Sequence, residues 1–155
     1  MKRCVLLIVL ILLLTPAAGH CAIKPPRGFL KLNFGDSVKV VESKAKKQNW
    51  KYNSEFELDR TSMNRLYEGQ NFDTHTFIYV GFYKRKLISI GLFFNSDQLY
   101  TQFLSALTSE YSKPKRTVGM YSWEVGMGKI EIELKRELTN PYGCYELHYR
   151  KPRGK

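Results

Sequence analysis

The residues that could carry chemistry in this 155-residue chain are few and scattered. The three histidines are His20, His75 and His148, and none of them stands at the spacing of a zinc or other metal-binding motif. No Ser/His/Asp order, phosphate-binding glycine loop or closely spaced cysteine pair occurs in the chain. The sequence therefore predicts no metal, no cofactor and no catalytic residue, and we expect the protein not to be an enzyme.

His148 is the strongest remaining candidate for acid–base chemistry. It is expected on the polar face of the last strand, where it could approach Glu131 or Glu133 of the preceding strand. Two carboxylates spaced two residues apart on a strand point the same way, which also suits glycoside hydrolysis. A surface cross-strand pair is the simpler interpretation, and a secreted hydrolase that uses His148 with a nearby carboxylate is an alternative function.

Two sets of residues are candidate binding sites. The first is an aromatic face interrupted by glycines in segment 77–94, and it consists of Phe77, Tyr79, Tyr83 and Phe93. Spaced aromatic rings can receive a sugar, a base or an apolar side chain of a partner. Ordinary packing between neighbouring strands is the alternative for these four residues.

The second candidate site is basic. Its residues fall in three groups at predicted loops or chain ends: Lys84, Arg85 and Lys86; Lys113, Lys115 and Arg116; and Arg150, Lys151, Arg153 and Lys155. The whole chain carries a formal net charge of +11, and such a field favours anionic partners. The three groups would form an anion site if the fold brought them together, and a well-solvated surface is the alternative.

The N-terminus has the pattern of an export signal. Lys2 and Arg3 precede an uncharged apolar run that ends in small residues, so residues 1–19 are expected to be a cleaved signal peptide and not a membrane anchor. An oxidising compartment would allow Cys21 and Cys144 to form a disulfide. Alternatively, Cys21 could be lipidated, which would make the protein an outer-membrane lipoprotein.

Segment 77–94 is expected to form the hairpin at the centre of a sheet. A charged loop of about three residues, Lys84–Lys86, would place Ile78, Val80 and Phe82 opposite Leu92, Ile90 and Ile88. Further strands are expected at residues 50–58, 66–72 with Gly69 as a bend or bulge, 121–125, 129–135 and 144–150. Helices are expected after Ser37 and after Ser96, each of which is a good N-cap residue.

The order of these elements predicts an α+β fold with an antiparallel sheet of about six to seven strands and both helices on one face. A helix followed by a meander occurs twice, which suggests an internal pseudo-repeat. We expect residues 20–28 to be a linker, residues 29–150 a single domain and residues 151–155 a basic tail.

Three segments carry a family resemblance. They are FGDSVKVV at 34–41, KLISIGLFF at 86–94 and LYTQFLSALTSEYSKP at 99–114, with Trp123 beyond them. Together they resemble small exported bacterial proteins whose layout is similar to outer-membrane assembly lipoproteins and β-lactamase-inhibitor-like domains. Ser112 replaces the glycine of the Tyr-Gly-Lys-Pro sequence usual in that class. The resemblance implies an α+β fold that binds proteins, and it implies no catalytic residue.

The function expected from the sequence is therefore that of a non-catalytic, exported bacterial envelope protein, located in the periplasm or outside the cell. It would act as a binding or adaptor module for a protein or an anionic envelope component. A secreted polyanion or nucleic-acid binder is the other alternative, although nucleic acid is the less favoured ligand.

Overall fold

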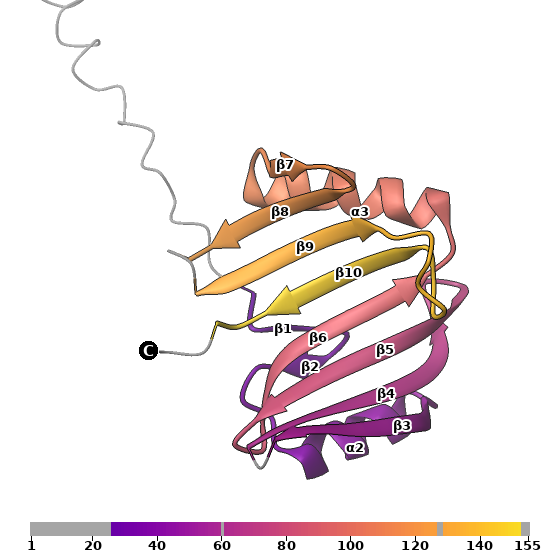
Figure 1. Cartoon of the computed structure of the whole chain (residues 1–155), viewed down its shortest axis with the longest axis vertical. Helices are drawn as coiled ribbons and strands as arrows, with labels where there is room; N and C mark the ends of the chain where they lie inside the picture. The colour runs from indigo at the N-terminus through magenta and orange to yellow at the C-terminus, as the bar shows by residue number, and fades with distance from the viewer. Residues whose placement is uncertain (1–25, 60, 127–128, 153–155) are drawn as a thin grey trace, which may run out of the picture.

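The structure is a computed structural model that describes residues 26–59, 61–126 and 129–152. The predicted signal peptide, Cys21, Arg153 and Lys155 lie outside the described residues. Within them the chain forms two layers, an antiparallel sheet and two helices (Figure 1). No helix in the described ranges is long and apolar enough to cross a membrane.

The large sheet has eight strands in the order β3-β4-β5-β6-β10-β9-β8-β7. Its strands are β3 (Lys51–Asp59), β4 (Ser62–Asn71), β5 (Thr74–Tyr83), β6 (Lys86–Phe94), β7 (Lys115–Thr117), β8 (Met120–Val125), β9 (Ile130–Arg136) and β10 (Tyr145–Arg150). The helices are α2 (Val38–Lys47) and α3 (Asp97–Tyr111). A separate two-stranded hairpin is formed by β1 (Gly28–Phe29) and β2 (Leu32–Asn33).

The order of elements repeats about the centre of the sheet. Helix α2 precedes the meander β3 to β6, and helix α3 precedes the meander β7 to β10. The last strands of the two halves, β6 and β10, pair antiparallel in the middle, so β3 and β7 become the outer edges (Figure 1). The predicted helix-and-meander pattern is therefore present twice in the topology.

The α+β class and the antiparallel sheet agree with the sequence-based expectation, but the predicted count of six to seven strands was too low. The strand that was missed, β7, has the sequence Lys-Arg-Thr, and all three residues are exposed. It shows none of the apolar alternation by which a half-buried strand is recognised. The predicted linker at residues 20–28 also ends in structure, because Gly28 begins β1.

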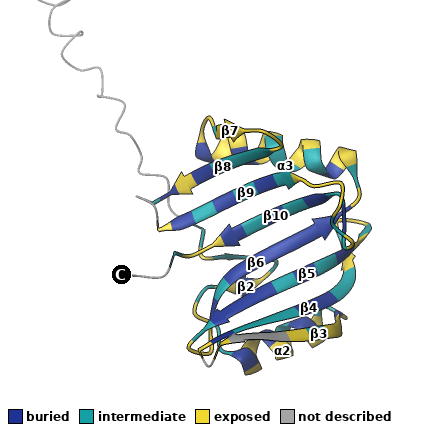
Figure 2. Ribbon diagram, viewed as in Figure 1, coloured by how far each residue is buried: buried dark blue, intermediate teal, exposed yellow. Residues whose placement is uncertain are grey.

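Both helices cover the same face of the sheet. The apolar stripe of α2 (Val38, Val41 and Ala45) and that of α3 (Leu99, Leu107 and Tyr111) are buried, and both belong to one hydrophobic core with the strands. Phe29 of β1 stacks on Tyr149 of β10 with ring centroids 4.6 Å apart, so the small hairpin lies on this face too. Figure 2 shows the most complete burial along the central strands.

The central hairpin has the predicted position and most of the predicted register. Ile78 pairs with Leu92 and Val80 pairs with Ile90, as expected. A register shift after Gly81 then places Phe82 opposite Leu87, so the expected pairing of Phe82 with Ile88 was wrong.

The loop of this hairpin is shorter than predicted, because Lys86 already belongs to β6. Only Lys84 and Arg85 connect the strands, with φ values of 48° and 60°. Positive φ at both central residues is the geometry that a two-residue type I′ turn requires.

Two further details of the sheet correct the sequence-based expectation. The alternation of Trp50, Tyr52 and Ser54 with polar residues predicts that Tyr52 faces the core. Tyr52 is instead 57% exposed, and the pairing of β3 with β4 shifts between Tyr52 and Ser54. Gly69 was expected to mark a bend or bulge, but it pairs regularly with Thr76. The absence of a side chain at Gly69 instead makes room for the Trp50 indole, because a Cβ at position 69 would lie 2.6 Å from it.

Candidate functional site

The face of the sheet opposite the helices is the candidate functional surface. In the described residues both helices and the β1–β2 hairpin lie behind the sheet in the view of Figure 1. One loop reaches over one end of the free face, where Tyr142 packs against Phe77 and Phe93 with ring centroids 5.2 and 6.0 Å apart. We call this surface the uncovered face.

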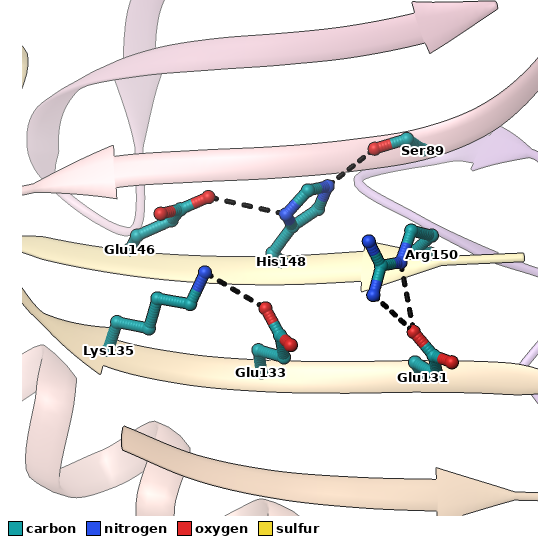
Figure 3. A network of polar contacts seen from close by, with 7 residues as sticks. All are labelled: Ser89, Glu131, Glu133, Lys135, Glu146, His148 and Arg150. Atoms are coloured by element: carbon teal, nitrogen blue, oxygen red, sulfur yellow. Dashed lines mark hydrogen bonds and ion pairs between the residues drawn. The ribbon is translucent and has the colours of Figure 1, made fainter. Parts of the chain in front are cut away.

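The uncovered face places a hydroxyl, an imidazole and a carboxylate in line (Figure 3). Glu146 and His148 are two residues apart on β10 and therefore share a face, and Ser89 lies on the neighbouring strand β6. The Ser89 Oγ lies 2.5 Å from the His148 Nε2, and the His148 Nδ1 lies 3.3 Å from the Glu146 Oε1. Ser89 is only 6% exposed, so the hydroxyl at one end of this row of three side chains is sheltered from solvent.

The environment of Glu146 favours its ionised form. Burial pushes the pKa of Glu146 upward, but the hydrogen bond and positive charge of His148, together with the charge of Lys135, outweigh it. The net pKa of Glu146 therefore lies below its ordinary value. A carboxylate that remains ionised can accept a hydrogen bond from the imidazole and so orient it.

Neighbouring ion pairs hold the surrounding side chains. Lys135 Nζ lies 2.9 Å from Glu133 Oε2, and Arg150 Nε donates to Glu131 Oε2 at 2.9 Å (Figure 3). Burial lowers the pKa of Lys135, but the hydrogen bond to Glu133 and nearby carboxylates raise it more. His148 does lie opposite Glu133 on the same face, as expected. The expected side-chain interaction with Glu131 or Glu133 was wrong, because these two carboxylates contact Arg150 and Lys135, and His148 contacts Glu146 of its own strand.

A pocket of about 380 Å³ opens beside Ser89 and His148. Ser89, His148 and Arg150 line it together with Asn64, Tyr79, Gly81, Phe82, Ile88, Glu131, Lys151 and Pro152. The absence of a side chain at Gly81 keeps this pocket open. A Cβ at position 81 would fill part of it and would lie 3.1 Å from Asn64 Oδ1 and 3.4 Å from the Tyr79 hydroxyl. Burial, followed by the negative charge of Glu146, raises the pKa of Tyr79, so its phenol stays a hydrogen-bond donor.

The four aromatic residues predicted to bind a ligand lie in three different settings. Phe77 and Phe93 are packed beneath Tyr142, and Phe93 is only 9% exposed. Tyr79 packs edge to face on the His148 ring, with ring centroids 5.8 Å apart, and it lines the pocket. Tyr83 lies at the end of β5, where Lys84 Nζ is 5.4 Å from its ring centroid. Of the four, Tyr79 is the one that lies at the pocket.

The basic residues predicted to form an anion site are spread over the sheet. Lys84 and Arg85 occupy the β5–β6 turn and Lys86 begins β6, whereas Lys115 and Arg116 lie on the edge strand β7 and Lys113 precedes it. Strands β6 and β7 are separated by β10, β9 and β8, which is about 19 Å at ordinary strand spacing. The structure does not bring these two groups together, although Arg150 and Lys151 of the third group line the pocket.

The predicted disulfide lies partly outside the described residues, because Cys21 is not among them. Cys144 is partly buried and forms no disulfide with any described residue, and its backbone N–H donates to Asn95 Oδ1 at 2.7 Å. Within the described residues no group of three or more His, Cys, Asp or Glu side chains could hold a metal ion.

Ser89 is the site residue that was missed in the sequence. It lies 59 positions from His148, so no local motif joins the two. The available signal was that Ser89 is the one hydroxyl in the apolar strand sequence KLISIGLFF.

No model of a known protein family matches this chain, and no curated protein or solved structure matches it either.

Proposed function

We propose that this protein is an exported binding module that engages another protein through the uncovered face of its eight-stranded sheet. The observation that carries the proposal is the one-sided layering of the described chain, in which both helices and the small hairpin pack on the same face. An antiparallel sheet with one covered face presents the other to solvent or to a partner. Export is supported by the charge and apolar pattern of residues 1–19.

The size of the uncovered face suits a protein partner. Eight strands span seven strand spacings, or about 34 Å. A strand of six residues, such as β10, is about 20 Å long. The product is about 700 Å², close to the roughly 800 Å² that each partner contributes to a standard protein–protein interface.

The charge of one part of this face, from β8 to β10, argues for a protein partner and against a polyanion. From β8 to β10 the register places four carboxylates on the uncovered face, Glu124, Glu131, Glu133 and Glu146, against two cations, Lys135 and Arg150. This part of the surface is therefore acidic in a chain whose formal net charge is +11. A nucleic acid or an anionic lipid surface would be repelled here, whereas a partner surface that is basic at its rim would be attracted.

Site-specific photo-crosslinking in the native host tests the proposal. A photoreactive phenylalanine derivative at Ser122 or Glu124 of β8 would sample the uncovered face, and the same residue at Lys39 of α2 or Ser105 of α3 would sample exposed helix positions as a control. We expect the two β8 positions to give one discrete protein adduct and the two helix positions to give none.

A charge reversal sharpens the test. Glu124 is exposed on β8, so Glu124→Lys should lower the adduct yield from Ser122 several-fold without lowering the thermal stability of the protein. Adducts of equal yield from both faces, adducts with lipid only, or no adduct from β8 would each contradict the proposal.

A further inference from the structure

We propose that Ser89 is the nucleophile of an acyl-transfer site on the uncovered face, with His148 as its general base and Glu146 as the residue that positions the imidazole. This activity goes beyond binding, and it stands on side-chain geometry that does not depend on a protein partner. The proposed substrate is a carboxylic ester with a small acyl group.

The order of the three groups is the one that nucleophilic catalysis requires. One imidazole nitrogen, Nε2, faces the hydroxyl at 2.5 Å, and the other, Nδ1, faces the carboxylate at 3.3 Å. With Nδ1 protonated and directed at Glu146, Nε2 is free to accept the Ser89 proton. This constellation is recognised by geometry and roles, because it recurs in unrelated folds with different chain orders.

Strand pairing and side-chain packing both hold the three groups in this geometry. Arg150 is the register partner of Ser89, and Gly91 is the register partner of His148. A glycine at position 91 leaves space beside the imidazole, and a Cβ there would meet the Tyr79 side chain at 3.4 Å and Glu146 Oε1 at 3.9 Å. Tyr79 in turn packs edge to face on the His148 ring at 5.8 Å. The imidazole is therefore held between a ring, a carboxylate and a hydroxyl.

The pocket supplies a place for the acyl group and a donor for the developing negative charge. Asn64 Oδ1 and the Tyr79 hydroxyl lie 3.1 and 3.4 Å from the position of a Cβ on Gly81, and the Ser89 Cβ lies 3.1 Å from the same point. The Tyr79 phenol therefore lies beside the nucleophile and can donate a hydrogen bond to an oxyanion, whereas the Asn64 atom at this point is an amide oxygen, which accepts. The apolar walls, Phe82 and Ile88, suit a short acyl chain.

The proposed reaction balances with water as the only co-reactant. Ser89 Oγ forms a bond to the ester carbonyl carbon while its proton passes to His148 Nε2. The bond from that carbon to the alcohol oxygen breaks, and the alcohol leaves with the proton from Nε2. A water molecule then attacks the acyl-serine, gives its proton to Nε2, and releases the carboxylic acid while Ser89 regains its hydrogen.

A purely structural hydrogen bond between β6 and β10 is the competing explanation, and chemical reactivity separates the two. The test is incubation of the folded full chain with a fluorophosphonate probe, followed by mass spectrometry of the intact protein and of its peptides. We expect one adduct per chain, located on Ser89. We also expect p-nitrophenyl acetate to release p-nitrophenolate with an initial burst.

Three variants with a matched control assign the roles. Ser89→Ala should abolish the adduct, and His148→Gln should slow its formation by about a hundred-fold or more. Ser122→Ala is the control, because Ser122 is a hydroxyl on the same face whose Oγ donates to the Lys115 carbonyl oxygen and has no imidazole partner. This variant should label at the wild-type rate. Gly81→Ala should slow labelling by partly filling the pocket.

Glu146→Gln tests the positioning role through a pH profile. The carboxylate faces His148 Nδ1 and would stabilise the imidazolium that forms when Nε2 takes the Ser89 proton, so its removal should slow labelling and change the pH profile of the labelling rate. The charged and titratable groups around His148 that stay unchanged are Glu131, Glu133 and Lys135 on β9, Arg150 on β10 and Tyr79 on β5. A merely structural role for Glu146 would not move this profile.

Lack of an adduct on the folded wild-type protein would overturn the proposal, whatever the variants do. Labelling of several serines at similar rates, or labelling of Ser89 that survives His148→Gln in a folded variant, would overturn it equally. None of these outcomes affects the crosslinking test of the binding face, so the two proposals can fail separately.

Discussion

At the scale of single residues, Gly69 shows how an absent side chain shapes the core. It lies near the C-terminal end of β4, and the indole of Trp50, which is 6% exposed, occupies the space where its side chain would be. Trp50 also packs against Tyr67 with ring centroids 6.3 Å apart. Trp50, which lies between α2 and β3, thus packs against β4 in the space that Gly69 leaves.

We predict that Gly69→Ala will destabilise the protein by about 1–3 kcal/mol, the usual cost of overpacking. The added Cβ would lie 2.6 Å from Trp50 Cδ1, so the buried indole would have to move. The measurement is urea unfolding followed by tryptophan fluorescence.

Gly91→Ala is the matched control for that prediction. A Cβ at Gly91 would meet its nearest neighbour, Tyr79 Cβ, at 3.4 Å, which is an ordinary contact. It should change the free energy of unfolding by less than about 0.5 kcal/mol. If both variants lost the same stability, strand conformation rather than the fit of Trp50 would be the cause.

At the scale of elements, the two helices begin differently although both were predicted to start after a serine. Ser96 precedes α3, and its hydroxyl accepts a hydrogen bond from the backbone N–H of Leu99 at 3.1 Å. Ser37 precedes α2 but makes no side-chain cap. Near α2 it is Asp36 that is engaged, because its carboxylate accepts from the Asn33 backbone N–H at 2.9 Å and from Lys44 Nζ at 2.7 Å.

This difference predicts unequal costs for the same substitution. Ser96→Ala should lower the free energy of unfolding by about 1 kcal/mol, the usual contribution of an N-cap side chain. Ser37→Ala should lower it by less than about 0.5 kcal/mol, since no capping bond is lost. Chemical denaturation of the two variants under identical conditions measures both values, and a larger loss for Ser37→Ala would contradict the structural difference.

At the scale of the whole molecule, the two helix-and-meander halves share one core. Leu92 of β6 pairs with Leu147 of β10, which pairs in turn with Leu134 of β9, and all three side chains are fully buried. The core formed by the described residues extends from Val38 of α2 to Trp123 of β8 without a boundary between the halves. The repeat therefore describes the topology and not two independent folding units.

We predict one cooperative unfolding transition with protection that declines from the centre to the edges of the sheet. Amides of β6 and β10 should exchange with deuterium only through global unfolding, whereas those of the edge strands β3 and β7 should exchange at least about ten-fold faster through local opening. Native-state hydrogen exchange measures this order. Two separate transitions would show that the halves open independently, and equal protection of β7 and β10 would contradict the predicted decline toward the edge.

The sequence determined most of the elements, because each of these depends on a local residue pattern. The stripes Val38, Val41, Ala45 and Leu99, Leu107, Tyr111 fall on one side of a helix at 3.6 residues per turn, and the alternation in residues 130–134 fixes a strand with one buried face. These patterns were sufficient to predict both helices, the α+β class and the central hairpin. They were not sufficient for β7, whose three exposed residues bury nothing and so leave no periodic trace.

Only the tertiary structure decided which residues meet at the candidate site. The pairing of β6 with β10 joins segments about 60 residues apart and so brings Ser89 to His148. The pairing of β9 with β10 brings Glu131 to Arg150, and Glu133 forms its ion pair with Lys135 of its own strand instead of with His148. The physical reason is that a side chain's face follows from its own strand, whereas its neighbours across the sheet follow from strand order and register, which the packing of the whole core selects.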